Sequence, residues 1–146
     1  MAMSELDKSC FMNVALEIFS RSDLKPIADA FGSNVAVLYL GKEFGLFKAY
    51  FYPGWPQSNT PETGILRYCK LIQKLSIEDR KLWDSAKSRS FDLGFEGPKE
   101  GRHYWGAVSQ KAVRAAAEVG AQIAISIYGP MKVAKQTKKK RAAPAR

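Results

Sequence analysis

The sequence contains few of the residues that metal and catalytic sites use most. It has one histidine, His103, and two cysteines, Cys10 and Cys69, in 146 residues. The two cysteines are too few and too far apart for a disulfide framework, and no cluster of His, Cys, Asp and Glu has metal-ligand spacing. We therefore expect no metal, reduced thiols and a core position for Cys69, which lies at helical spacing from apolar neighbours.

A glycine fingerprint for phosphate binding is also missing. Four glycines lie close together in the second half of the chain: Gly94, Gly97, Gly101 and Gly106. They lack the order GxGxxG and the strand-then-helix context of a dinucleotide site, and no Gly-Lys-Ser/Thr sequence follows a glycine-rich loop. We expect no nucleotide cofactor.

Two kinds of hydrophobic segment are missing as well. The N-terminus lacks the basic-then-apolar plan of a signal peptide, and no apolar run approaches the roughly 20 residues of a membrane span. These absences favour a cytoplasmic location.

Acidic residues are absent from residues 131–146, where the positive charge gathers. The net charge of the chain is +9, and this segment holds seven of the 23 basic side chains. Residues 1–130 therefore carry a balance of only +2. A chain of this length is most simply one domain. We expect a flexible lead-in over residues 1–10, a single domain over residues 11–130 and a basic flexible tail over residues 131–146.

Hydrophobic periodicity predicts a strand, a helix and a hairpin in the first third of the chain. Apolar side chains alternate with other residues over residues 11–19, which is the period of a strand, and they gather at helical spacing over residues 27–31. Residues 35–40 and 44–52 are rich in strand-forming side chains. The short loop of residues 41–43 between them suits a hairpin.

Capping residues and alternation define the remaining elements. Thr60 followed by proline starts one helix, and Ser76 caps a second. Residues 91–96 alternate as a strand, and the loop that follows leads to a further strand. Ser109 caps a third long helix, and alternating isoleucines over residues 123–127 form a closing strand. The mixture of elements with short connections predicts an α+β fold, in which three to four helices cover one mainly antiparallel sheet of about five to six strands.

Several segments carry a resemblance to a known family. They are LEIFSRSDLKPIADAFG (16–32), FDLGFEG (91–97), WGAVSQKAVRAAAEVG (105–120) and IAISIYGP (123–130). Together they resemble a widespread bacterial α+β domain family of unknown function, which pairs an apolar strand with a capped helix and a closing "isiY" strand. Some members lie beside polymorphic-toxin genes, so the resemblance implies a toxin-neutralising, immunity-like role. Residues 35–52 depart from the family pattern, and the basic tail is an addition to it.

The loop of residues 96–106 is the strongest candidate for a functional site. It brings Arg102, His103, Tyr104 and Trp105 together, and aromatic and Arg side chains are enriched at binding hot spots. Trp55 lies on a separate Pro-rich loop, and this aromatic residue is a candidate for partner binding for the same reason. Two other interpretations stay open at this point. In the first, the rings pack on the sheet, and in the second, His103 acts as a general base that a carboxylate orients.

The tail supports a competing interpretation. Its charge density would attract phosphate backbones with an affinity that falls steeply as salt rises, without reading sequence. The tail residues that would make these contacts are Lys132, Lys135, Lys138, Lys139, Lys140 and Arg141. The sequence thus favours a non-enzymatic protein-binding domain, with an immunity protein as its most concrete form and a nucleic-acid-associated accessory protein as the alternative.

Overall fold

A computed structural model describes residues 10–56, 60–97 and 103–129 of the chain. Within these ranges five strands and four α-helices form an α+β fold, as the periodicity predicts. The strands are β1 (Phe11–Ser20), β2 (Val35–Glu43), β3 (Leu46–Pro53), β4 (Ser88–Glu96) and β5 (Gln122–Tyr128). The helices are α2 (Lys25–Phe31), α3 (Pro61–Gln73), α4 (Ile77–Asp84) and α5 (Gln110–Glu118). None of these helices has the length and apolar character needed to cross a membrane.

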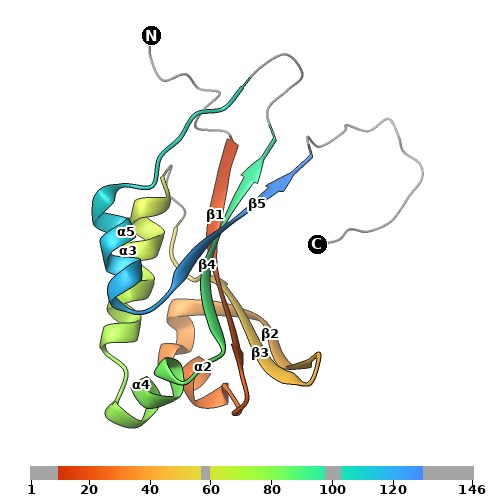
Figure 1. Ribbon diagram of the computed structural model, residues 1–146, viewed down its shortest axis with the longest axis vertical. Coiled ribbons are helices and arrows are strands. Elements are labelled where there is room, and N and C mark those ends of the chain that lie inside the picture. The colour runs from red at the N-terminus through yellow and green to blue at the C-terminus, as the bar shows by residue number, and fades with distance from the viewer. Residues whose placement is uncertain (1–9, 57–59, 98–102, 130–146) are drawn as a thin grey trace, which may run out of the picture.

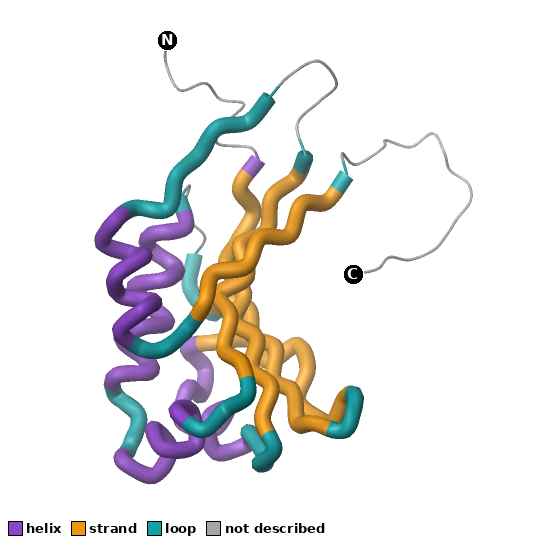
Figure 2. Tube along the Cα trace, in the orientation of Figure 1, coloured by secondary structure: helices purple, strands orange, loops and turns teal. Residues whose placement is uncertain are grey.

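The strands form a single sheet in the order β2-β3-β1-β4-β5. β1 lies at its centre and pairs antiparallel with β3 and with β4, while β2 pairs antiparallel with β3. β5 runs parallel to β4, because α5 carries the chain back across the sheet between them. The four described helices lie on one side of the sheet, and none of them covers the other side (Figures 1 and 2). β2 and β5 are therefore the two edge strands.

The hydrophobic core lies between the sheet and the helices. Every second residue of the central strands points toward the helices, because side chains alternate between the two faces of a strand. The largest fully buried side chains are Trp83, Tyr68, Phe31, Phe51, Phe91, Leu16, Ile18, Leu24, Ile27, Ile65, Ile72 and Leu93. Cys69 belongs to this core, as its spacing predicts, and burial raises the pKa of its thiol to about 11.

Two contacts fix α3 on the sheet. Gly64 lets the helix approach β1 closely, since a Cβ at this position would lie 3.0 Å from Val14 Cγ2. One turn later, the hydroxyl of Tyr68 donates to the carbonyl oxygen of Val14 at 3.0 Å and lies 3.4 Å from that of Phe51. Desolvation by burial raises the pKa of Tyr68 well above its ordinary value, so the hydroxyl stays a donor.

A second set of contacts fixes the start of β5. The indole Nε1 of Trp83 donates to the Val119 carbonyl at 2.7 Å, and Nε of Arg89 donates to the Gly120 carbonyl at 2.8 Å. The same guanidinium also donates to the Trp83 carbonyl at 2.9 Å. These bonds join α4 and β4 to the end of α5, so the chain leaves α5 beside β4.

The predicted caps are confirmed at two helices. The hydroxyl of Ser76 accepts from the Asp79 amide, and that of Ser109 accepts from the Ala112 amide, each at 3.1 Å. Gly120 follows α5 with φ 79°, a conformation that glycine adopts without steric cost.

Two details of the predicted elements are wrong. β2 does not end before residues 41–43 but continues to Glu43, because its ladder with β3 extends to the pair Glu43–Leu46. The turn is therefore Phe44-Gly45. Residues 103–109 also form no strand, because β5 takes the place beside β4 and these residues lead away from the sheet to α5.

Three predicted segments fall wholly or partly outside the described residues. Of the lead-in over residues 1–10, the structure describes Cys10 alone, and this residue is buried. Arg102 and the tail over residues 131–146 also lie outside the described ranges.

The turn at Phe44 should respond to substitution in a way that tests this hairpin. Phe44 has φ 58° and Gly45 has φ 78°, the pair of positive angles of a type I′ turn, and the Phe44 side chain is 87% exposed. Asn-Gly is the favoured sequence for such a turn. Phe44→Asn should therefore raise the free energy of unfolding by about 0.5 to 1 kcal/mol, as chemical denaturation would measure.

Phe44→Ala is the control for the loss of the exposed ring. Alanine keeps the unfavourable positive φ, so the free energy of unfolding should change little. Equal stabilisation by both substitutions would contradict the assigned turn.

Candidate functional site

The structure places the described residues that the sequence suggests for partner binding in three different surroundings. His103 and Tyr104 line an apolar pocket, whereas Trp55 lines a second pocket elsewhere on α3. Trp105 lies on the surface with 62% of its area exposed. Within the described residues, the two pockets are therefore the candidate sites.

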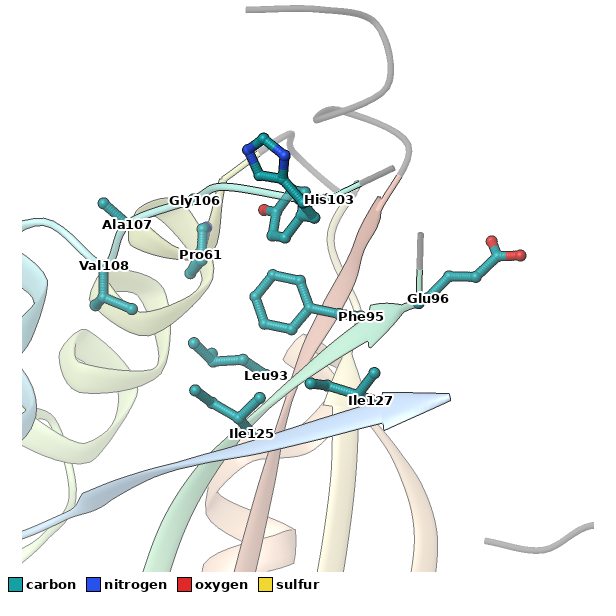
Figure 3. A pocket seen from close by; sticks show the side chains of 12 residues that line it. Pro61, Leu93, Phe95, Glu96, His103, Gly106, Ala107, Val108, Ile125 and Ile127 are labelled. Atoms are coloured by element: carbon teal, nitrogen blue, oxygen red, sulfur yellow. The ribbon is translucent and has the colours of Figure 1, made fainter. Parts of the chain in front are cut away.

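The apolar pocket has a volume of about 440 Å³ and lies where the sheet extends past the helices. Figure 1 shows the ends of β4 and β5 reaching beyond the start of α3 and of α5, with the segment before α5 passing over the gap. The residues that line it come from β4 and the position after it, from β5, from the start of α3 and from the segment before α5 (Figure 3). They are Pro61, Leu93, Phe95, Glu96, Gly97, His103, Tyr104, Gly106, Ala107, Val108, Ile125 and Ile127.

The floor of the apolar pocket is made by neighbouring pairs on β4 and β5. Leu93 pairs with Ile125, and Phe95 pairs with Ile127, so four apolar side chains share one face of the two strands. Leu93 is fully buried, but Ile125 and Ile127 are 61% and 70% exposed. Two large aliphatic side chains on an edge strand are thus left in contact with water.

One wall of the apolar pocket is aromatic. The ring of Tyr104 is tilted against that of Phe95 with centroids 5.3 Å apart, and Phe95 makes an edge contact with Phe11 at 5.5 Å. Gly106 permits this arrangement, because a Cβ there would collide with the Tyr104 hydroxyl group.

The rim of the apolar pocket carries two polar side chains, Glu96 and His103. Figure 3 shows the Glu96 carboxylate pointing away from the other lining side chains, while the His103 ring lies on the segment before α5. Within the described ranges, no hydrogen bond joins His103 to a carboxylate. No group of three or more His, Cys, Asp or Glu in these ranges has the arrangement of a metal site. The chemistry that this pocket offers is burial of an apolar group.

The second candidate, which we call the cationic pocket, has a volume of about 430 Å³. Trp55 is the aromatic residue in its lining. The Trp55 ring packs against Tyr68 with ring centroids 5.0 Å apart, and the Arg67 guanidinium lies 5.2 Å from the centre of the Trp55 ring. The residues that line it are Ser33, Asn34, Gly54, Trp55, Pro56, Arg67, Lys70, Leu71 and Lys74. Three of them are cationic and none is acidic.

Sequence reasoning missed this group of cations. Arg67, Lys70 and Lys74 follow the spacing i, i+3, i+7, which places them on one side of a helix. That pattern is common on solvated helix faces. Only the turn at residues 33–34, brought opposite α3 by the fold, makes the group into a pocket.

Comparisons with protein-family models, with curated proteins and with solved structures find no match to this chain.

The aromatic wall predicts a specific effect of enlarging Gly106. In Gly106→Ala, the added methyl group should displace Tyr104 from Phe95, while the fold is kept because the tyrosine ring can move outward. Ring-to-ring nuclear Overhauser effects between Tyr104 and Phe95 should weaken or vanish, and the melting temperature should fall by only a few degrees.

Gly129→Ala is the matched control, since a Cβ at position 129 meets no atom within 4 Å. That variant should keep the ring-to-ring effects. If Gly106→Ala keeps them as well, the close approach of Tyr104 to Gly106 is not present in solution.

Proposed function

We propose that this protein is a non-enzymatic binding domain that captures an extended segment of a partner protein along β5, with an apolar side chain of the partner in the apolar pocket. The observation that carries the proposal is the pair Ile125 and Ile127, which are exposed on an edge strand and line an apolar pocket. Strand addition supplies affinity through main-chain hydrogen bonds, and pockets for alternate side chains supply specificity.

The edge position of β5 supports this mode of binding. Among the described residues, β4 is the only strand that pairs with β5, so within this part of the chain the outer side of β5 is an edge that another strand can join. A partner strand at β5 would direct every second side chain to the helix side of the sheet, where the apolar pocket lies. The pocket volume is in the range that holds a small-molecule ligand, and is therefore ample for a large side chain.

The size of the expected effect follows from apolar burial. Ile125 and Ile127 keep well over half of their surface in water when no partner is present. Covering one such side chain contributes about 1.5 to 3 kcal/mol. Losing most of that contribution at both positions weakens binding by at least about tenfold.

Toxin neutralisation is the most concrete form of this proposal. The resemblance of residues 91–97, 105–120 and 123–130 to a domain family found beside polymorphic-toxin genes supports it. In that form the captured segment belongs to the toxin, and the protein acts by occupying a surface that the toxin needs.

The proposal is tested by selecting linear peptides on the full-length protein from a phage-displayed library. Selected peptides should share apolar residues at alternate positions. Fluorescence anisotropy should show that Ile125→Thr/Ile127→Thr weakens their binding at least about tenfold, because threonine keeps the strand preference but removes apolar surface.

Val37→Thr/Leu40→Thr is the matched control. These two aliphatic residues are 46% and 39% exposed on β2, the opposite edge of the same sheet. Binding to this variant should equal binding to the wild type. An equal loss of affinity in both variants would contradict the proposal. So would a selection that yields no peptide binding the wild type more tightly than the Ile125→Thr/Ile127→Thr variant.

The basic tail supports a second candidate function, an accessory role on nucleic acid. Seven cations and no acid in residues 131–146 favour binding to phosphate backbones. The full chain should then retard random single- and double-stranded DNA in a gel at low salt, and a chain ending at residue 130 should not. Retardation that is absent at low salt, or that survives removal of the tail, rules this role out.

A further inference from the structure

The cationic pocket contains an unopposed concentration of positive charge. In the described part of the chain, Lys25, Lys48 and Arg80 each have a carboxylate within 4.0 Å. Arg67, Lys70 and Lys74 have none there. Three cations that share one cavity without an acid repel one another, and an anion would relieve this repulsion.

The wall opposite α3 is held rigidly. The Gly54 amide donates to the Asn34 carbonyl at 2.9 Å, and the Asn34 side chain donates to the Phe31 carbonyl at 3.0 Å. The two segments touch so closely that a Cβ at position 54 would lie 2.7 Å from the Asn34 carbonyl oxygen. The fold itself thus fixes the wall of the cavity that lies opposite α3.

The remaining lining suits an organic group as well as an anion. Trp55, Pro56 and Leu71 give the cavity an apolar side, and Ser33 adds a hydroxyl group. Residues 67 to 74 span about 10 Å along a helix, which is longer than a single phosphate. A volume of about 430 Å³ likewise exceeds the volume of one inorganic anion.

We propose that the cationic pocket binds a phosphate monoester with a compact organic body. The dianionic phosphate would lie among Arg67, Lys70 and Lys74, where Arg donates in a fork and Lys contributes a compact charge. The organic body would lie against Trp55. This site shares no lining residue with the apolar pocket, so the inference goes beyond the proposed function and does not depend on it.

Such an ester has two sources, a free metabolite and a phosphorylated side chain, and two probes separate them. Phenyl phosphate represents the free ester, and a phosphoserine tripeptide with blocked ends represents the modified side chain. Their dephosphorylated counterparts, phenol and the serine tripeptide, measure any contribution of the organic part alone.

The experiment is a titration of the full-length protein at physiological ionic strength, followed by the indole N–H resonance of Trp55 and the amide of Asn34. Both residues line the cationic pocket, so their signals report on binding there. At least one phosphorylated probe should shift them to saturation, and its dephosphorylated counterpart should not. The probe with the lower dissociation constant identifies the source of the ester.

Two double variants locate the binding site. Lys70→Gln/Lys74→Gln should raise the dissociation constant at least about tenfold. Lys111→Gln/Arg114→Gln removes the same number of charges from exposed positions on α5, and it should leave the dissociation constant within about twofold. Circular dichroism checks that both variants are folded.

Several outcomes would overturn the inference. They are a failure of both phosphorylated probes to shift the Trp55 resonance, equal shifts by the dephosphorylated counterparts, and equal weakening in the two double variants. The last result would show that the ester responds to net charge and not to the pocket. None of these outcomes bears on peptide capture at β5, which is measured with different variants.

Discussion

The close docking of α3 on β1 is the constraint on which both pockets depend. Gly64 lets the helix backbone approach Val14, and the buried Tyr68 hydroxyl bonds to the main chain of the same residue. With α3 held in this position, Pro61 at its start becomes a wall of the apolar pocket, and Arg67 on its other side faces the cationic pocket. A shift of this one helix would change the shape of both cavities.

The apolar pocket arises from a mismatch between the lengths of the two layers. The sheet extends past the helices, so the apolar pattern of β5 continues where no helix covers it (Figure 1). Ile123 packs against the core, whereas Ile125 and Ile127 on the same face remain exposed. Folding alone does not require isoleucine at positions 125 and 127, since threonine also has a high strand propensity on an exposed edge strand. This excess of apolar surface is what a binding role would use.

Local signals in the sequence located most of the elements but not the sites. Alternation identified β1, β4 and β5, and the caps Ser76 and Ser109 are present as predicted, because these features depend on neighbouring residues. The turn at Phe44 escaped prediction because phenylalanine is a poor residue for positive φ, and the ladder between two strands imposes it there. Composition suggests a binding role for both Trp55 and His103, but it cannot show that they line different pockets. The spacing of Arg67, Lys70 and Lys74 is that of a solvated helix face, and only the fold brings the turn at residues 33–34 opposite them.

Capture of an extended segment at β5 is tested most directly by backbone hydrogen exchange with a selected peptide bound. Main-chain pairing at the free edge would slow exchange of the amides in Gln122–Tyr128 that point away from β4, and it would leave exchange along the opposite edge strand, Val35–Glu43, unchanged. We expect this asymmetric protection. Unchanged exchange in β5 at saturating peptide, or equal protection of both edge strands, would contradict the account.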